Sequence, residues 1–229
     1  MSEADDRREI WVVGASRGIG RVLAEGLEQS SSRPVRRIAR SLGVDFGDAA
    51  TRRELLDAYG APFAWIHAPG DFLEKPLLET PDADWEQLLA SNFWSFVHPA
   101  RDLLPAMGKQ GSGRVLCFGA AGLSLGTAKL RGPAYFAVKA ALASVVKTLA
   151  LEFGRMGVTV NMLSPGIIVH EHSHQESQKR LAPRVPLGRA GRAEDLFGAT
   201  ELLLGEKGAY ITGQELTVDG GLSLGFGHA

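Results

Sequence analysis

The chain has 229 residues, of which 45% are hydrophobic and 22% are charged, and its formal net charge at pH 7 is -1. A chain of this length can enclose one complete hydrophobic core, so these values predict a single folded domain. The near-zero net charge excludes a broad basic surface of the kind that attracts nucleic acid or an anionic membrane. We therefore expect neither of these partners.

The single cysteine, Cys117, lies in the apolar run from Arg114 to Phe118, so an intrachain disulfide is impossible and a buried thiol is expected. The first six residues are acidic and polar and lack the basic start and apolar stretch of a signal peptide. No run of about 18 apolar residues is present in the sequence. These features favour a cytoplasmic protein that stays in solution.

Short β-branched segments alternate with longer helical patterns along the chain. Strands are predicted at residues 10–13, 35–39, 63–67, 115–118, 158–163 and 216–218. Helices are predicted at residues 18–29, 49–59, 82–107, 133–154 and 193–204. Most of the strands are apolar throughout, which is typical of a parallel sheet covered on both faces. The alternation predicts an α/β fold over residues 1–229, a single doubly wound, Rossmann-like domain with helices on both faces of the sheet.

Residues 167–190 are interpreted as a lid or substrate loop. The stretch from Val169 to Glu176 is polar and aperiodic, which predicts a long loop or a loosely helical segment. In an α/β sheet such a segment usually borders the ligand crevice.

A glycine-rich turn, Gly14-Ala15-Ser16-Arg17-Gly18-Ile19-Gly20, joins the first predicted strand to the first predicted helix. Glycines let a pyrophosphate approach the helix N-terminus, where unpaired N–H groups and the helix dipole favour negative charge. Alone, such a string is also compatible with a plain turn, but its place between a strand and a helix favours nucleotide binding. The expected cofactor contacts here are Gly14, Ser16, Arg17, Gly18, Ile19 and Gly20.

The GxxxGxG spacing of this turn resembles the short-chain dehydrogenase/reductase family, and the resemblance covers nearly the whole chain. Residues 135–139, Tyr-Phe-Ala-Val-Lys, resemble the family's YxxxK motif. Asn161 with Ser164-Pro165-Gly166 is similar to a further motif, and segments 187–195 and 210–221 are similar to the C-terminal signature. The resemblance implies an oxidoreductase that exchanges a hydride with a nicotinamide cofactor.

The charge at the end of the second predicted strand favours NADP(H). A carboxylate there would accept a hydrogen bond from a ribose 2′-hydroxyl but repel a 2′-phosphate, and the segment from Val35 to Ser41 has none. The arginines of this segment, together with Arg17, provide guanidinium groups that could clamp the phosphate. Solvated surface charge is the alternative interpretation of these arginines.

The resemblance implies further cofactor contacts. Asp45 is expected at the adenine edge, and the connection from Arg40 to Asp45 is shorter than in most members of the family. We therefore expect a helix and part of a strand to be absent there. The other contacts expected by similarity are Arg40, Phe46, Ala68, Gly70, Lys139, Pro165, Gly166 and Ile168.

Tyr135 and Lys139 are the candidate proton-transfer pair. Four residues apart on a helix, they share one face about one turn apart. A tyrosine with a pKa of about 10 is a poor acid/base at neutral pH, but a nearby ammonium and an oxidised nicotinamide favour its phenolate. Such a pair is common by chance, and only its place in the order of motifs singles it out. The resemblance implies that Lys139 also holds the nicotinamide ribose.

Asn92 stands where the family keeps an asparagine that kinks its helix and holds a water of the proton relay. The alternative is an exposed helical amide.

The family's catalytic serine has no counterpart in this chain. Gly119 stands at its position, followed by Ala120-Ala121-Gly122, and about three extra residues precede Tyr135. Ser124 in this longer loop is the candidate substitute donor. Losing a preorganised donor costs about 10²- to 10³-fold in rate when nothing replaces it. Three interpretations stay open: another donor such as Ser124, a bond supplied by the substrate or a water, or a changed chemistry.

Histidines account for two other departures from the family. His67-Ala68-Pro69-Gly70 replaces Asn-Asn-Ala-Gly, and Pro69 removes a backbone donor. His67 is interpreted as structural, with a strand cap or a cofactor contact as alternatives. His170 replaces a threonine and alternates with His172 and His174, but no acidic or thiol partner with suitable spacing accompanies them, so no metal is predicted.

The predicted helix at residues 133–154 carries apolar side chains on every face. One face can cover the sheet, and another then needs a second cover. We therefore predict a homodimer or homotetramer formed partly through this helix, as in the family.

The first hypothesis is an NADP(H)-dependent enzyme that interconverts a carbonyl and an alcohol on a small-molecule substrate, with Tyr135 exchanging the proton. The alternative is a non-redox role, either a lyase or isomerase that uses Tyr135 or a catalytically silent NADP(H)-binding protein. The missing serine is the feature that separates the two.

Overall fold

The computed structural model describes residues 8–126, 128–169 and 182–225. A six-stranded sheet runs through its centre in the order β2-β1-β3-β4-β5-β8, and every neighbouring pair is parallel. The strands are β1 (Ile10–Val13), β2 (Val35–Ile38), β3 (Ala64–His67), β4 (Gly113–Phe118), β5 (Val158–Pro165) and β8 (Glu215–Val218). The doubly wound α/β class is thereby confirmed.

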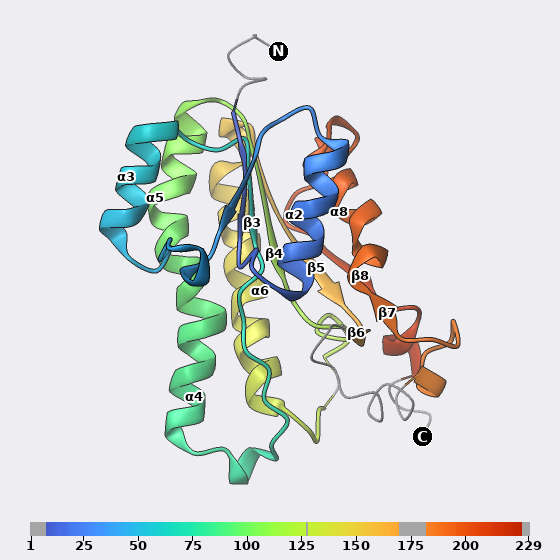
Figure 1. The fold of residues 1–229 in the computed structure, drawn as a ribbon. Coiled ribbons are helices and arrows are strands. Elements are labelled where there is room, and N and C mark those ends of the chain that lie inside the picture. Colours follow the sequence, from blue (N-terminus) through green and yellow to red (C-terminus); the bar gives the residue numbers. More distant parts are fainter. Residues whose placement is uncertain (1–7, 127, 170–181, 226–229) are drawn as a thin grey trace.

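Helices cover both faces of the sheet (Figure 1). On one face lie α3 (Ala49–Tyr59), α5 (Ser95–Lys109) and α6 (Pro133–Phe153), and on the other lie α2 (Gly18–Ser30) and α8 (Phe197–Leu204). One-turn 3-10 helices lie at Arg40–Leu42, Leu77–Glu79, Gly154–Met156, Ala182–Arg184, Ala193–Leu196, Glu206–Gly208 and Leu222–Gly225.

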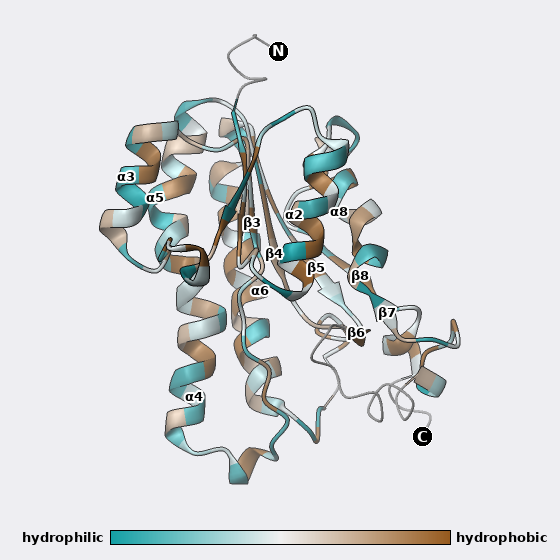
Figure 2. Ribbon diagram, viewed as in Figure 1, coloured by the Kyte–Doolittle hydropathy of each residue, from teal (hydrophilic) through white to brown (hydrophobic). Residues whose placement is uncertain are grey.

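The core consists of two apolar layers, one on each side of the sheet. The layer under α5 and α6 contains the stacked rings of Trp65 and Phe96, whose centroids are 4.8 Å apart. The layer under α2 and α8 contains Leu23, Leu116 and Leu163. Every residue of β1, β3 and β4 is buried, which explains why their sequences show no polar alternation. Figure 2 shows the hydrophobic residues concentrated on the strands and on the inner sides of the helices.

The connection from β2 to α3 is short. Between Ile38 and Ala49 the structure contains only the 3-10 turn Arg40–Leu42, so β2 is an edge strand of the sheet. The expected absence of a helix and part of a strand in this segment agrees with the structure. The edge is protected by charge, because Arg36 and Arg37 of β2 both form ion pairs.

The predicted helix at residues 82–107 is interrupted. It divides into α4 (Asp82–Leu88), a π-helical turn at Leu89–Trp94, and α5. The side-chain amide of Asn92 donates to the Leu88 carbonyl at 3.2 Å, which is the acceptor that the Asn92 backbone N–H would use in a regular α-helix. The kink expected at Asn92 is therefore present as a π-bulge.

Helix α6 presents its inner face to β5 and to the π-helical turn. Residues Pro133–Met156 have the length and hydropathy of a membrane-crossing helix, but the buried inner face identifies it as a core helix of the α/β fold. The expectation that every face is apolar is wrong for the outer stripe. At helical spacing this stripe exposes small and polar residues together with one large apolar residue: Ala137, Ala140, Ala141, Ser144, Lys147, Thr148 and Leu151.

One strand of a small pair that the sequence did not predict lies in the region predicted as a lid, and the other directly follows the last residue of that region. Strand β6 (Ile168–Val169) pairs in parallel with β7 (Gly191–Arg192), outside the main sheet. The rest of the predicted lid includes residues 170–181, which lie outside the described residues.

Asn161 anchors the C-terminal segment to β5. Its side chain donates to the Ile211 carbonyl at 2.8 Å and accepts from the Gln214 N–H at 3.0 Å. The motif residue thus fixes the strand end from which Pro165 and Gly166 enter the site.

Candidate functional site

A large pocket lies at the carboxyl ends of the strands, where the strand order reverses at β1. Strand β2 lies on one side of β1 and strand β3 lies on the other. Such a switch point is where α/β sheets bind ligands. The pocket lining includes most of the expected cofactor contacts: Gly14, Ser16, Arg17, Gly18, Ile19, Gly20, Arg40, Asp45, Phe46, Ala68, Gly70, Pro165, Gly166 and Ile168.

Two glycines of the turn occupy positions where a side chain would strain the backbone or clash with it. Gly14 has a φ of +82°, and a Cβ on Gly20 would lie 2.4 Å from the Gly14 carbonyl oxygen. Helix α2 begins at Gly18, its first turn contains no acidic residue, and the N-cap Arg17 makes no side-chain capping bond. Its first N–H groups therefore face the pocket mouth without an internal acceptor, which suits a phosphate.

The arginines near this turn divide into two sets. Arg17 and Arg40 are exposed and line the pocket, and no described residue forms an ion pair with either one. Arg36 is held by Glu9 at 2.6 Å, and Arg37 by Glu28 at 2.5 Å. Of the guanidinium groups expected at a 2′-phosphate, only Arg17 and Arg40 are placed to reach one.

Asp45 and Phe46 follow the short connection after β2. The Asp45 carboxylate accepts from the Gly47 N–H at 2.9 Å and remains exposed in the pocket wall. Phe46 also borders the pocket, but its ring is 5% exposed and packs edge-on against Trp11 in the core. Its side chain therefore supports the pocket wall from below.

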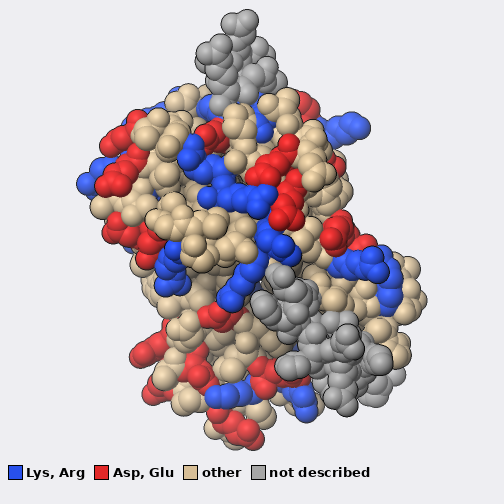
Figure 3. Space-filling view, in the orientation of Figure 1, with Lys and Arg blue, Asp and Glu red and all other residues tan. Residues whose placement is uncertain are grey.

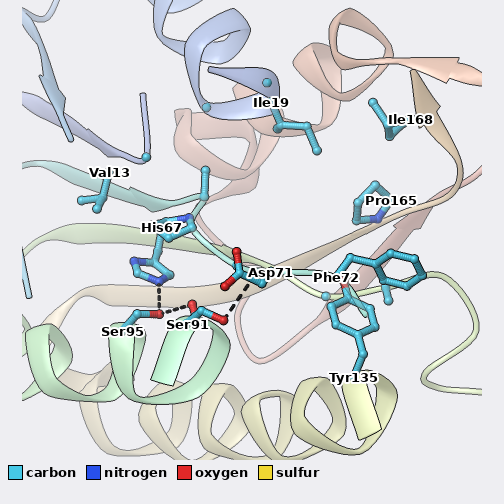
Figure 4. A pocket seen from close by; sticks show the side chains of 18 of the residues that line it. Val13, Ile19, His67, Asp71, Phe72, Ser91, Ser95, Tyr135, Pro165 and Ile168 are labelled. Atoms are coloured by element: carbon cyan, nitrogen blue, oxygen red, sulfur yellow. Dashed lines mark hydrogen bonds between the residues drawn. The ribbon is translucent and has the colours of Figure 1, made fainter. Parts of the chain in front are cut away.

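Tyr135 and Lys139 lie on the first turns of α6. The Lys139 ammonium is buried and donates to the Phe118 carbonyl at 2.7 Å, where β4 ends. Burial lowers the pKa of Lys139 to about 8, and it raises the pKa of Tyr135 to about 12. At neutral pH the lysine is therefore mostly charged and the tyrosine keeps its proton. Tyr135 lines the pocket, with Phe72 edge-on to its ring at 5.0 Å (Figure 4).

Asn92 is buried, 1% exposed, next to the pocket-lining residue Ser91. Its Nδ2 donates to the Asp71 carbonyl at 3.0 Å as well as to Leu88. A Cβ on Gly70 would lie 2.4 Å from Asn92 Oδ1 and 3.4 Å from Lys139 Nζ. The asparagine and the lysine therefore flank the same small space beside Gly70, and the alternative of an exposed helical amide is excluded.

The wall after β4 is apolar. Gly119, Ala120 and Ala121 are buried and line the pocket. A Cβ on Gly119 would lie 2.3 Å from Ser164 Oγ and 2.6 Å from Met162 Sδ. Ser124, the candidate substitute donor, is exposed in the following turn and does not line the pocket.

Four polar residues that line the pocket form a row linked by hydrogen bonds. Sequence reasoning did not select Asp71, Ser91 and Ser95, and it left open the role of His67, the last residue of β3 (Figure 4). His67 Nε2 lies 3.0 Å from Ser95 Oγ, and Ser95 Oγ donates to the Ser91 carbonyl at 2.6 Å. The only sequence signal for this row was the replacement of the family's asparagine by His67.

Metal ligation finds no support in the described residues. Within residues 8–126, 128–169 and 182–225, no group of three or more His, Cys, Asp or Glu side chains is placed to hold a metal ion. His170, His172 and His174 lie outside the described residues.

Comparisons with known proteins agree with this geometry. Residues 39–223 match the protein family described as enoyl-(acyl carrier protein) reductase. The chain is 30% identical to the 3-oxoacyl-[acyl-carrier-protein] reductase FabG of Escherichia coli K12, over 93% of this chain and 96% of that protein. It is 29% identical to FabG of Haemophilus influenzae, over 93% and 97%. The TT0495 protein of Thermus thermophilus superposes with a TM-score of 0.80 at 30% identity, over 94% of this chain and 98% of that one.

The packing around Gly119 predicts opposite outcomes for two serine substitutions. Gly119→Ser forces atoms against Ser164 and Met162, and overpacking of this kind costs about 1–3 kcal/mol of unfolding free energy. Ala120→Ser adds only a hydroxyl to a side chain that already lines the pocket. Urea unfolding should show a clear decrease in the free energy of unfolding for Gly119→Ser and little change for Ala120→Ser. Equal stability of the two variants would contradict the tight packing described at Gly119.

Proposed function

The chain belongs to the short-chain dehydrogenase/reductase family, and on that premise we propose that it is an NADP(H)-dependent oxidoreductase that interconverts a carbonyl and an alcohol on a small-molecule substrate. One observation carries the proposal: a single pocket is lined by the uncapped N-terminus of α2 and by Tyr135, and the buried Lys139 ammonium lies 5.6 Å from the centroid of the Tyr135 ring. Each of these groups has a distinct task in such a reaction.

The residues of the pocket fit a dinucleotide. The backbone N–H groups at the start of α2 would hold its diphosphate, and Ala68, Gly70, Pro165 and Ile168 would line its path toward Tyr135. The cofactor supplies the hydride that is exchanged with the substrate carbon. The protein supplies binding, orientation and the proton.

The preference for a 2′-phosphate rests on Arg17 and Arg40. Both are exposed at the pocket, and no described acidic side chain neutralises either one. A guanidinium group forms charge-assisted bonds to phosphate oxygens and has no comparable partner in an unphosphorylated ribose. NADP(H) is therefore the cofactor that this pocket favours.

The proton comes from Tyr135 when a carbonyl is reduced. Burial keeps the pKa of the phenol at about 12 in the cofactor-free protein, so the side chain carries its proton into the reaction. The Lys139 ammonium, positively charged below its pKa of about 8, lowers the free energy of the phenolate that the transfer leaves behind. Asn92 lies beside Lys139 and belongs to the route by which that proton is replaced.

The apolar wall of Gly119, Ala120 and Ala121 is the observation behind the alternative. A reacting oxygen near this wall receives no side-chain hydroxyl from β4, and Ser124 does not line the pocket. A non-redox lyase or isomerase, or a catalytically silent NADP(H)-binding protein, would tolerate this loss more easily than a ketoreductase.

We also propose that the protein is a cytoplasmic homodimer or homotetramer, without a nucleic-acid or membrane partner. The outer stripe of α6 is mostly small residues, which permit close helix approach, and it ends at Leu151, which is 85% exposed. The face of the molecule seen in Figure 3 carries positive and negative side chains interspersed. Such a surface offers no field of one sign for a polyanion.

The cofactor proposal predicts a selective effect of two arginines. Arg17→Gln and Arg40→Gln should each raise the Kd for NADPH by about tenfold or more and leave the Kd for NADH nearly unchanged, because each removes a charge-assisted bond to the 2′-phosphate. Isothermal titration calorimetry measures both. Arg37→Gln is the matched control, since its guanidinium is held by Glu28. Equal losses for the two cofactors would contradict this role.

The catalytic proposal predicts that Tyr135→Phe abolishes turnover and preserves cofactor binding. General acid catalysis by a positioned side chain contributes about 10²- to 10⁴-fold, so at least that much rate should disappear. NADPH consumption would be followed with a panel of ketones, aldehydes and 3-oxoacyl thioesters, with Tyr210→Phe as the control because Tyr210 is fully exposed. Tight NADPH binding by the wild type without turnover on any member of the panel would favour the non-redox alternative.

The assembly proposal predicts that Leu151→Glu disrupts the oligomer. A carboxylate at this position would be buried unpaired between copies of α6, so size-exclusion chromatography with light scattering should show a shift toward the monomer. Leu78→Glu, at a residue that is 98% exposed on the 3-10 turn Leu77–Glu79, is the control and should leave the mass unchanged. A well-folded monomeric wild type would refute the assembly.

A further inference from the structure

His67 is a buried imidazole with a fixed environment. Its ring packs edge-on against the stacked rings of Trp65 and Phe96, with both centroid distances at 5.6 Å, and the residue is 2% exposed. Burial, and then the nearby charge of Lys139, lower the pKa of His67 to about 3. The ring is therefore neutral across the physiological range, with one nitrogen protonated and the other bare.

The hydrogen bonds of Ser95 determine which nitrogen of His67 carries the proton. Ser95 Oγ has one hydrogen, which it donates to the Ser91 carbonyl at 2.6 Å. At the 3.0 Å contact with His67 Nε2 the hydroxyl can only accept, so Nε2 is the protonated nitrogen. Nδ1 is then a bare acceptor, and it is buried without a partner among the described residues.

Asn92 presents a second bare acceptor nearby. Its Nδ2 donates to two backbone carbonyls, which fixes the amide orientation and directs Oδ1 away from them. Oδ1 is buried and receives no hydrogen bond from the described residues. Oδ1 and Lys139 Nζ flank the space beside Gly70, as shown above.

The Lys139 ammonium has N–H donors to spare close to Asn92 Oδ1, and its charge acts on His67. It has three N–H bonds, and the Phe118 carbonyl takes one of them. Buried acceptors in proteins are nearly always satisfied, and ordered water bridges groups that cannot meet directly. The titratable groups that act on this region are Lys139 from α6 and Cys117 from β4, the strand neighbour of His67. The pKa of the Cys117 thiol is raised by burial to about 12, so it stays uncharged.

We propose that His67 is a positioning residue for Lys139: its Nδ1, together with Asn92 Oδ1, accepts hydrogen bonds from the ammonium through buried water, while Ser95 holds the ring in that orientation. Acceptors around an ammonium stabilise its charged form, and a charged Lys139 in turn favours the phenolate of Tyr135. The hydrogen-bonding arrangement stands on the cofactor-free protein. Only its consequence for Tyr135 during turnover rests on the proposed function.

Two substitutions separate the two nitrogens of His67. Asparagine can present its carboxamide oxygen near the position of Nδ1, whereas glutamine reaches the position of Nε2 and can donate to Ser95. His67→Asn should therefore keep the acceptor for Lys139, and His67→Gln should lose it. A ring that serves only to fill space would give similar losses in the two variants.

The first measurement is a spectrophotometric titration of tyrosinate in the complex with NADP⁺, with Tyr135→Phe as the baseline for the other tyrosines. His67→Gln should raise the pKa of Tyr135 by about one unit relative to wild type, equivalent to about tenfold less phenolate at a given pH, and His67→Asn should change it little. Equal shifts in the two variants, or no shift in either, would overturn the proposal.

The second measurement is independent of the cofactor. Nitrogen NMR of histidine-labelled protein, with the His67 signals assigned from their absence in His67→Gln, should show protonated Nε2 and a hydrogen-bonded Nδ1. A protonated Nδ1, or a Nδ1 whose chemical shift is that of a free lone pair, would refute the arrangement. If NADP⁺ does not bind at all, the proposed function fails, whereas this spectrum still decides the role of His67.

Discussion

The buried ammonium of Lys139 is the constraint around which the site is organised. A cation removed from water costs several kcal/mol unless hydrogen bonds replace its hydration, and here the Phe118 carbonyl at the end of β4 is the one direct acceptor among the described residues. That bond joins the first turns of α6 to the centre of the sheet. It also fixes the position of Tyr135, which lies one turn earlier in α6 and lines the pocket.

The sheet makes this arrangement possible because its register aligns the strand ends. Val13, His67 and Cys117 are paired across β1, β3 and β4, so the residues that follow these strands emerge at one level. The glycine turn, the segment 68–72 and the apolar wall all begin there. The short β2–α3 connection leaves β2 at the sheet edge and brings Arg40 to the same pocket.

Hydrophobic periodicity and helix-end signals were sufficient to predict the strands to within about two residues and most of the helices. The central strands are apolar, and glycine, proline or a capping residue marks the start of α2, α3, α4 and α6. The π-turn at Leu89–Trp94 was not predictable in detail, since it depends on a side chain, Asn92, competing with its own backbone for the Leu88 carbonyl. The strand pair β6–β7 has only two residues in each strand, too few for a pattern.

The site residues that local backbone geometry requires could be predicted from the sequence. Those whose role depends on which side chains they contact in the fold were harder to predict. Gly14 and Gly20 are fixed by local geometry that glycine alone allows. The arginines were ambiguous, because nothing in the run Arg36-Arg37 indicates that Glu9 and Glu28, distant in the sequence, hold both of them away from the pocket. The contact between His67 and Ser95 could not be predicted for the same reason, because the two residues are 28 positions apart and only the tertiary fold brings them together.

The two sides of the pocket differ in polarity. Beside β4, Gly119 is packed so closely against Ser164 and Met162 that a side chain at that position would force those two to shift. The neighbouring alanines contribute none of the hydroxyl donors that stabilise a developing oxyanion. Beside β3, Asn92 Oδ1 and the Lys139 ammonium flank the space next to Gly70, and His67 Nδ1 is buried without a partner among the described residues. In the proposed reaction Tyr135 is the hydroxyl donor at the reacting oxygen, and its strength as a donor depends on the charge of Lys139. On that proposal, the polar surroundings of the lysine carry the part of the chemistry that the apolar wall does not.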